Sequence, residues 1–318
     1  MIVSYKTPLM KSRNIFLFAI ALFIGIVANA QQDPHYTQYM YNMNIINPAY
    51  AGSTGTLNLN LLARKQWVDI DGAPKTITFN ANAPVGRRVG MGFAVTADEI
   101  GPAKEQNIYM DFSYTIDVSE KGSLAFGLKG GLTLLDVNLI DITLPQTSTS
   151  DDDLFSENIH DAFPNFGAGA FYYTEKFYIG LSVPNILKSE HLDKGNVYTK
   201  AAEEMHFYLA SGYVFDLSDN LKFKPHVMVK GVNGGRVSFD LNANFLFNER
   251  LELGAGYRYQ DAITGLINFG VTRSFRIGYA YDYTISDYSF GNTGSSHEII
   301  LLYDISFTKK DIKSPRFF

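Results

Sequence analysis

The 318-residue sequence contains no cysteine, and this absence excludes several kinds of chemistry. Disulfide bonds, thiolate nucleophiles and cysteine-ligated metal centres all require the sulfur of this residue. The sequence also lacks a strong charge of one sign, since 27 Lys and Arg residues face 32 Asp and Glu residues and the formal net charge is −5 at pH 7. Its basic residues are dispersed, and we therefore expect no nucleic acid as a partner.

Long apolar runs are absent beyond residue 30, so that part of the chain predicts no membrane-spanning helix. The apolar run at 15–27 follows a basic segment and precedes the small-x-small pattern "ANA" at 28–30. It is shorter than the roughly 20 residues that an uncleaved membrane anchor needs. We expect residues 1–30 to be a cleaved Sec-type signal peptide, with Gln31 as the first mature residue.

Aromatic residues make up 14% of the chain, yet its mean hydropathy is only −0.06, because polar and apolar residues alternate. In "RIGYAYDYT" (276–284), Ile and Tyr occupy every second position, with small or charged residues between them. Successive side chains of a strand point to opposite faces, so such a segment has one apolar and one polar face. Similar segments recur at 57–61, 76–82, 89–96, 108–116, 124–132, 237–245 and 251–259. The alternation is less strict at 298–307, and less regular segments lie near 165–174, 176–183, 204–215, 221–230 and 262–272.

These segments of roughly ten residues number about fourteen, which is typical of a transmembrane β-barrel. The links between them fall into two alternating sets, one short and one with long members such as 138–163 and 185–202. Outer-membrane barrels alternate short periplasmic turns with longer external loops, whereas a soluble β-sandwich, the competing interpretation, has no reason to sort its links. The sequence therefore predicts an all-β fold, an antiparallel up-and-down barrel of the outer membrane, over residues 53–308.

The polar face of these segments predicts the barrel interior. A charge on the lipid-facing side costs roughly 2–4 kcal/mol at the bilayer midplane, so the tyrosines of 276–284 should face lipid, and Arg276 and Asp282 should face the lumen. Arg258 and Glu298 occupy polar-face positions of neighbouring strands. We expect the four residues to form a network of paired charges in the lumen.

Residues 31–52, "QQDPHYTQYMYNMNIINPAYAG", break the alternation ahead of the first strand. Asp33-Pro34 suits the start of a helix, and an apolar stripe at helical spacing runs from Tyr36 to Met43. "NPAYAG" then reads as a turn whose glycine is free to adopt a positive φ. We expect a short amphipathic helix that plugs the barrel, since a disordered leader, the alternative, seldom carries so many Tyr and Met residues. The predicted plug residues are Pro34, Tyr36, Tyr39, Met40, Asn47, Pro48 and Gly52.

The ordered set of motifs is similar to that of one family. "DPHYTQYMYN", "NPAYAG", "GYAYDYT", "GSSHEIILLYDISF" and a tail ending in "PRFF" together resemble the PorP/SprF family. The resemblance implies an outer-membrane barrel of the type IX secretion system of Bacteroidota, which supports secretion or surface anchoring of large adhesin-type proteins with a C-terminal sorting domain. Implied further partners are periplasmic secretion-ring and peptidoglycan-binding components, besides outer-membrane lipid. "NPAYAG" also resembles the hatch of FadL-type barrels, so a channel for small or hydrophobic solutes is the alternative function.

Recognition of a secreted partner is expected in the two longest loops, 138–163 and 185–202, because loops on a rigid scaffold commonly carry binding residues. Within the first loop, "TSTSDDD" (147–153) lacks the spaced ligands of a calcium site and indicates a solvated segment. The same loop also carries four apolar residues between its acidic residues, and these apolar side chains are suited to anchor a partner: Leu154, Phe155, Ile159 and Phe163.

No residue pattern predicts an enzyme, a metal site or a cofactor. Ser296 and His297 are neighbours, but adjacent strand residues face opposite ways, so the two side chains cannot meet as nucleophile and base. The six histidines lack metal-ligand spacing. Residues 309–318 form a basic tail, which we expect to be solvated in the periplasm, with docking on a partner as the alternative.

Overall fold

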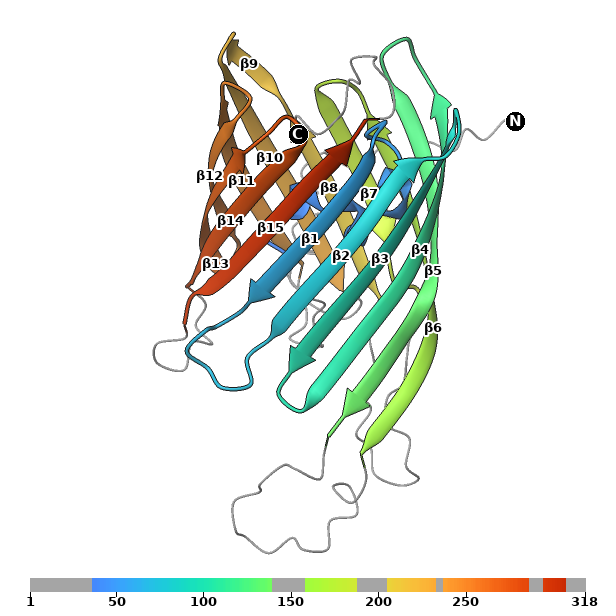
Figure 1. Ribbon diagram of the computed structural model, residues 1–318, viewed down its shortest axis with the longest axis vertical. Helices are drawn as coiled ribbons and strands as arrows, with labels where there is room; N and C mark the ends of the chain where they lie inside the picture. The colour runs from blue at the N-terminus through green and yellow to red at the C-terminus, as the bar shows by residue number, and fades with distance from the viewer. Residues whose placement is uncertain (1–35, 139–157, 188–204, 233–236, 286–293, 307–318) are drawn as a thin grey trace, which may run out of the picture.

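The protein is a closed antiparallel β-barrel with part of its N-terminal segment inside, as the computed structural model in Figure 1 shows. The structure describes residues 36–138, 158–187, 205–232, 237–285 and 294–306. Inside the barrel lie the short helices η1 (Tyr39–Tyr41), α2 (Met43–Ile46) and η2 (Pro48–Tyr50). The strands are β1 (Leu57–Lys65), β2 (Lys75–Pro84), β3 (Val89–Ile100), β4 (Ala103–Asp117), β5 (Ser123–Val137), β6 (Ile159–Tyr173), β7 (Phe177–Val183), β8 (His206–Tyr213), β9 (Phe215–Ser218), β10 (Leu221–Val232), β11 (Ser238–Phe247), β12 (Leu251–Arg258), β13 (Ala262–Gly270), β14 (Phe275–Thr284) and β15 (Ser296–Ile305).

The barrel closes where the first strand pairs with the last, with Leu57 of β1 opposite Ile305 of β15. β8 and β9 are two parts of one barrel strand, because both pair with β10 and only Val214 separates them. The barrel therefore has 14 strands, which confirms the predicted fold. Because the barrel is closed, the backbone N–H and C=O groups of its wall can all form hydrogen bonds within the sheet, as a lipid environment requires.

The two ends of the barrel differ in their links. The upper end in Figure 1 has short turns such as 118–122 and 174–176, and we call it the turn end. The lower end has the longer links, and we call it the loop end. β4, β5 and β6 have 15 residues each, and residues 159–167 of β6 lie beyond the loop end of β7, whose Val183 pairs with Ala168. A strand needs about 9–11 residues to cross a bilayer, so this part of the wall is longer than the crossing requires.

The two faces of β14 are sorted as the alternation predicts. Tyr279, Tyr281 and Tyr283 have 37%, 38% and 60% of their surface exposed on the outside of the barrel, whereas Asp282 is 2% exposed and Ala280 1%. In a membrane barrel the outward residues meet lipid and the inward residues meet the lumen. The tyrosines therefore belong to the lipid-facing surface.

Residues 36–52, the plug segment, lie inside the barrel, but the prediction of one amphipathic helix is wrong. Asn42 and Asn47 depart from helical dihedral angles, with φ of −127° and −140°, and separate three single-turn helices. A continuous helix would satisfy its own backbone and bury one face, whereas this segment is enclosed by polar wall side chains that bond its backbone groups. Among the described residues, no helix is long and apolar enough to cross a membrane.

The loop-end strands are longer than the sequence indicates. β6 begins at Ile159, and its first residues pair with the end of β5, with Phe163 opposite Thr133. The interpretation of Ile159 and Phe163 as loop residues is therefore wrong. A strand that continues past the bilayer needs no apolar lipid-facing side, so "IHDAF" (159–163) lacks the alternation by which the other strands were recognised. Leu154 and Phe155, the other two residues of that set, lie outside the described residues.

Candidate functional site: the plugged lumen

Buried charges of the wall surround the plug segment, and the first group is centred on Arg64 of β1. Its guanidinium contacts Asp282 Oδ2 of β14 at 2.7 Å and Glu298 Oε2 of β15 at 3.2 Å. The three side chains, which we name the Arg64 cluster, are each at most 3% exposed. Charges buried this deeply are stable only when they are paired and hydrogen-bonded. The three charges meet inside the barrel because each residue occupies a lumen-facing position in the alternation of its strand.

The plug segment completes the hydrogen bonding of the Arg64 cluster. The backbone N–H groups of Thr37 and Gln38 donate to the two carboxylate oxygens of Glu298, at 2.9 and 2.8 Å. The Thr37 hydroxyl donates to Asp282 at 2.7 Å and accepts from Arg64 Nη1 at 3.1 Å. Wall and plug therefore satisfy each other here, and removing either one leaves buried polar groups without partners.

The structure brings three of the four predicted network residues together. Arg258 lies 3.7 Å from Asp282, and Asp282 shares Arg64 with Glu298. Arg276 does not join them. It lies near the turn end, where its Nη2 donates to the backbone carbonyl of Glu249 at 2.8 Å. Arg276 and Asp282 are separated by about 20 Å along β14, at roughly 3.4 Å per residue, so a shared face does not bring them into contact.

A second group, the Lys224 cluster, holds the plug from β10, β11 and β12. Lys224 Nζ lies 3.0 Å from Glu252 Oε2, and both side chains are 1% exposed. Asn244 Nδ2 donates to Glu252 at 3.0 Å, and the hydroxyl of Tyr41 in the plug donates to the same carboxylate. The ammonium of Lys224 also lies over the Tyr41 ring, 5.4 Å from its centre, a cation–π arrangement. Tyr41 is thus held by both charges of one buried pair.

A third group holds the plug from β4 and β5. Lys129 Nζ pairs with Asp111 Oδ1 at 3.1 Å, and neither side chain is more than 1% exposed. Asn44 of the plug donates from Nδ2 to the other carboxylate oxygen of Asp111 at 2.9 Å. The three groups lie on different parts of the barrel wall, so the plug is fixed from several directions.

Glycines let the plug backbone touch the wall. A Cβ atom added at Gly127 of β5 would lie 2.2 Å from the backbone nitrogen of Ala49, and one added at Gly90 of β3 would lie 2.1 Å from the carbonyl oxygen of Ala51. Neither distance is sterically possible without a backbone shift. Gly52, where the plug turns toward β1, has a φ of +74°, which confirms the positive φ expected there.

Asn47 stabilises the final turn of the plug and links it to the wall. Its Oδ1 accepts from the backbone N–H of Ala49 at 3.0 Å, so it caps the helix that Pro48 begins. Its Nδ2 donates to the carbonyl oxygen of Ala170 in β6 at 3.1 Å. Tyr36, Tyr39 and Met40, also predicted as plug residues, are buried inside the barrel. Pro34 lies outside the described residues.

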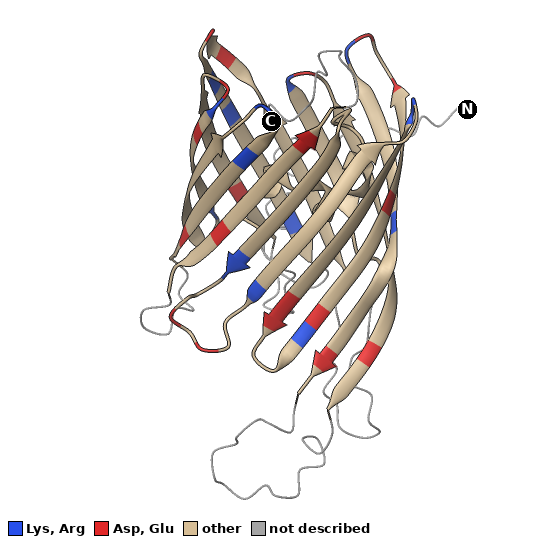
Figure 2. Ribbon diagram, in the orientation of Figure 1, with Lys and Arg blue, Asp and Glu red and all other residues tan. Residues whose placement is uncertain are grey.

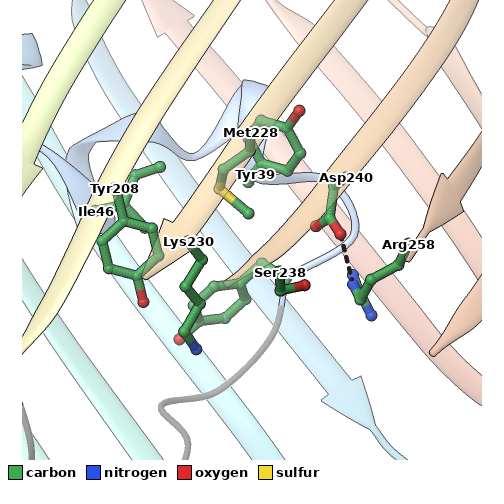
Figure 3. Close-up of a pocket in the computed structure, with 9 residues that line it drawn as sticks. Tyr39, Ile46, Tyr208, Met228, Lys230, Ser238, Asp240 and Arg258 are labelled. Carbon is green, nitrogen blue, oxygen red and sulfur yellow. Dashed lines mark hydrogen bonds and ion pairs between the residues drawn. The ribbon is translucent and has the colours of Figure 1, made fainter. Parts of the chain in front are cut away.

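A small recess of about 20 Å³ lies between the plug and the wall (Figure 3). Its plug side is aromatic and aliphatic, and its wall side adds Met228 together with the charged residues Lys230, Asp240 and Arg258. Figure 3 shows Arg258 beside Asp240, and Arg258 Nε donates to Asp240 Oδ1 at 3.0 Å. The recess therefore combines apolar surface with a charged edge. Its full lining is Tyr36, Tyr39, Ile46, Tyr208, Met228, Lys230, Ser238, Asp240 and Arg258.

Sequence reasoning did not identify Arg64 and Lys224, the two cations that organise the larger clusters. Both follow the alternation of their strands, because Arg64 continues the inward series of "LNLNL" and Lys224 shares a face with His226 and Met228. Continuing the alternation of 57–61 to the strand end would have placed Arg64 in the lumen, and Lys224 already lies within the predicted segment 221–230. Ser296 and His297 face opposite sides as predicted, with Ser296 buried and His297 hydrogen-bonded to the outward Tyr279 at 2.7 Å.

Comparison with known proteins places this geometry in context. The family model "Type IX secretion system membrane protein PorP/SprF" matches residues 28–303. No curated protein matches the chain. Among solved structures, the TodX deltaS2S3 mutant monoaromatic hydrocarbon channel is similar at a TM-score of 0.51 and 11% identity, over 90% of this chain and 98% of that chain. A FadL homologue of Pseudomonas aeruginosa gives a TM-score of 0.45 and 12% identity, over 86% and 95% of the respective chains. At these identities, the structural likeness concerns the fold alone.

Proposed function

Because the chain belongs to the PorP/SprF family of type IX secretion system membrane proteins, we propose that it supports the secretion or surface anchoring of large proteins that carry a C-terminal sorting domain. The observation that carries this proposal is a barrel of this family whose lumen is occupied by a plug fixed through buried ion pairs. Such a barrel is better suited to present rigid surfaces to other proteins than to pass them through its interior.

We assign different partners to the two ends of the barrel because the ends face different compartments. Short turns face the periplasm and longer links face outward in outer-membrane barrels, so the turn end is available to periplasmic secretion-ring and peptidoglycan-binding components. The loop end is available to the secreted or anchored protein. Residues 138–158 and 185–202 are the proposed contact segments, with Leu154 and Phe155 as apolar anchors.

The test is affinity purification of the tagged protein after gentle solubilisation from its native outer membrane, with mass spectrometry of the chains that accompany it. We expect a large surface protein with a sorting domain, or periplasmic ring components, in stoichiometric amount. Deletion of the gene should also abolish secretion or surface display of that protein. A barrel that purifies alone, with secretion unchanged in the deletion strain, would overturn the proposal.

The recess beside the plug favours one alternative function, a channel for small or hydrophobic solutes. Tyr39, Ile46, Tyr208 and Met228 supply apolar surface in this recess. Uptake of a labelled monoaromatic solute into vesicles that contain the purified barrel would favour the channel. Uptake no faster than into empty vesicles would leave the secretion role as the supported function.

A further inference from the structure

Outward-facing charges form a row across the loop ends of successive strands. Strand pairing places His297 of β15 opposite Lys65 of β1, Lys65 opposite Lys75 of β2, and Lys75 opposite Glu99 of β3. The row continues with Lys104 of β4, which lies opposite Glu99 on one side and Asp136 of β5 on the other. Figure 2 shows basic residues at the adjoining loop ends of β1 and β2. Most of the row therefore alternates in sign, but two lysines are direct neighbours.

The Lys65–Lys75 pair is unfavourable by itself. Directly opposed residues of an antiparallel pair have Cβ atoms about 4.5–5.5 Å apart, and like charges at that distance destabilise the sheet. Both lysine side chains are exposed on the outside of the barrel. Within the part of the chain that the structure describes, neither forms an ion pair or a hydrogen bond through its side chain. An anion between the two ammonium groups would offset their repulsion.

The surroundings of the pair indicate which anion. The next outward residues toward the turn end are apolar, namely Ala63 on β1 and Ile77 on β2, and Ile77 is 56% exposed. The pair therefore stands at the edge of the lipid-facing surface, where the phosphate of a membrane lipid lies next to its acyl chains. Lysine is well suited to bind phosphate as a point charge.

We propose that Lys65 and Lys75 bind the phosphate group of a phosphorylated glycolipid of the outer leaflet, with its acyl chains against the apolar surface of β1 and β2. His297 adds a polar edge beside Lys65, held in place by its hydrogen bond to Tyr279. The assignment to the outer leaflet depends on the orientation given under the proposed function, whereas phosphate binding by the lysine pair does not.

The chain has its own reporter and its own control for this site. Trp67, the single tryptophan, follows Lys65 by two residues, and its backbone N–H donates to the Ser296 hydroxyl oxygen at 3.2 Å. Its fluorescence should respond to a lipid bound at Lys65. Lys104 is an exposed lysine of the same row, but its cross-strand neighbours are acidic, so it has no like charge to be offset.

The experiment titrates the purified full-length barrel in detergent with diphosphoryl lipid A and follows Trp67 fluorescence. We expect saturable binding, weakened about five-fold by Lys65→Gln or Lys75→Gln and at least about ten-fold by the double variant. Lys104→Gln should change the affinity by less than about two-fold. Heat-modifiable migration in electrophoresis checks that each variant is folded, and the single variants keep the test decisive if the double variant does not assemble.

Two further titrations identify the ligand. Dephosphorylated lipid A should bind as weakly as diphosphoryl lipid A binds to the double variant, and inorganic phosphate alone should not saturate the site at millimolar concentration. Equal binding of diphosphoryl lipid A to the wild type and the double variant would overturn the proposal, as would an equal loss in Lys104→Gln. Tight binding of inorganic phosphate would overturn the lipid as its source. None of these outcomes depends on the secretion role.

Discussion

At the scale of single residues, the position of a charge decides what it contributes. Glu252 and Asp216 each pair with a lysine, but the side chains of Glu252 and Lys224 are 1% exposed whereas those of Asp216 and Lys176 are 44% and 52% exposed. Solvent screens the exposed pair, and the entropy lost in ordering two long side chains offsets most of what remains. The buried pair cannot lose one partner without leaving the other charge unsatisfied.

Glu252→Gln should therefore destabilise the protein by about 3 kcal/mol, because Lys224 stays buried with its charge uncompensated and Tyr41 then donates to a neutral amide oxygen instead of a carboxylate. The measurement is denaturant unfolding of the barrel in lipid vesicles. Asp216→Asn is the matched control and should cost less than about 1 kcal/mol. Equal losses in the two variants would show that the lumen is as well hydrated as the surface.

Backbone contact gives a second prediction at this scale. Gly127→Ala should displace the plug, because the new Cβ would overlap the backbone of Ala49. Since the chain has no cysteine, Ser53→Cys introduces a single thiol at a position that is 8% exposed. The rate at which a polar maleimide labels that thiol should rise several-fold in Gly127→Ala. It should not change in Gly265→Ala, where nothing lies within 4 Å of the added atom.

At the scale of elements, each strand has one face for lipid and one for the lumen. Tyr281→Asp should impair insertion of the barrel, because it places a charge on the lipid-facing surface, where charged side chains are unfavourable. Asp282→Asn should still insert, since its side chain stays in the lumen, although it weakens the Arg64 cluster. Heat-modifiable migration of membrane-extracted protein measures insertion. If only Asp282→Asn failed to insert, the assignment of the two faces would be reversed.

The strands were predictable from sequence because their alternation is a local property. The middle of each strand shows it, as "GYAYDYT" (278–284) does, and so the strand count and the two faces could be predicted. The ends of β5 and β6 could not, because polar residues such as His160 and Asp161 carry no signal of pairing. The plug was predicted as a helix because Tyr36, Tyr39 and Met40 have helical spacing, but its backbone partners come from distant strands.

The lumen clusters show the same limit. Asp282 and Glu298 could be placed on the inner face from their own strands. Their partner Arg64 lies more than 200 positions earlier and meets them only because β1 pairs with β15 across the closure. Which charges meet depends on register between strands, which alternation alone does not provide. Arg276 is on the polar face of β14 but lies near the turn end, far from Asp282. Alternation gives the face and not the position along the barrel axis, so the sequence could not exclude Arg276 from the network.

At the scale of the whole molecule, the plug occupies the lumen, and we expect it to block the passage of ions through the barrel. Purified wild-type protein in a planar bilayer should show little ohmic conductance, because the plug fills the lumen between the three buried groups. A variant that lacks residues 36–50 should conduct, provided that it still migrates as a folded barrel. Similar conductance in both proteins would mean that the plug does not block the path. Ser53→Cys with unchanged conductance serves as the control for handling.

The unequal lengths of the strands have a consequence for assembly. β5 has 15 residues and β12 has 8, so the two strands differ in length by about 24 Å, at roughly 3.4 Å per residue, and residues 159–167 of β6 lie beyond the end of β7 at the loop end. A protein that approaches the loop end meets a step rather than a level rim. The step lacks rotational symmetry about the barrel axis, so a rigid partner can seat against it in one azimuthal orientation only. If the proposed partner binds rigidly at the loop end, the height of this wall would fix the rotational orientation of that partner about the barrel axis.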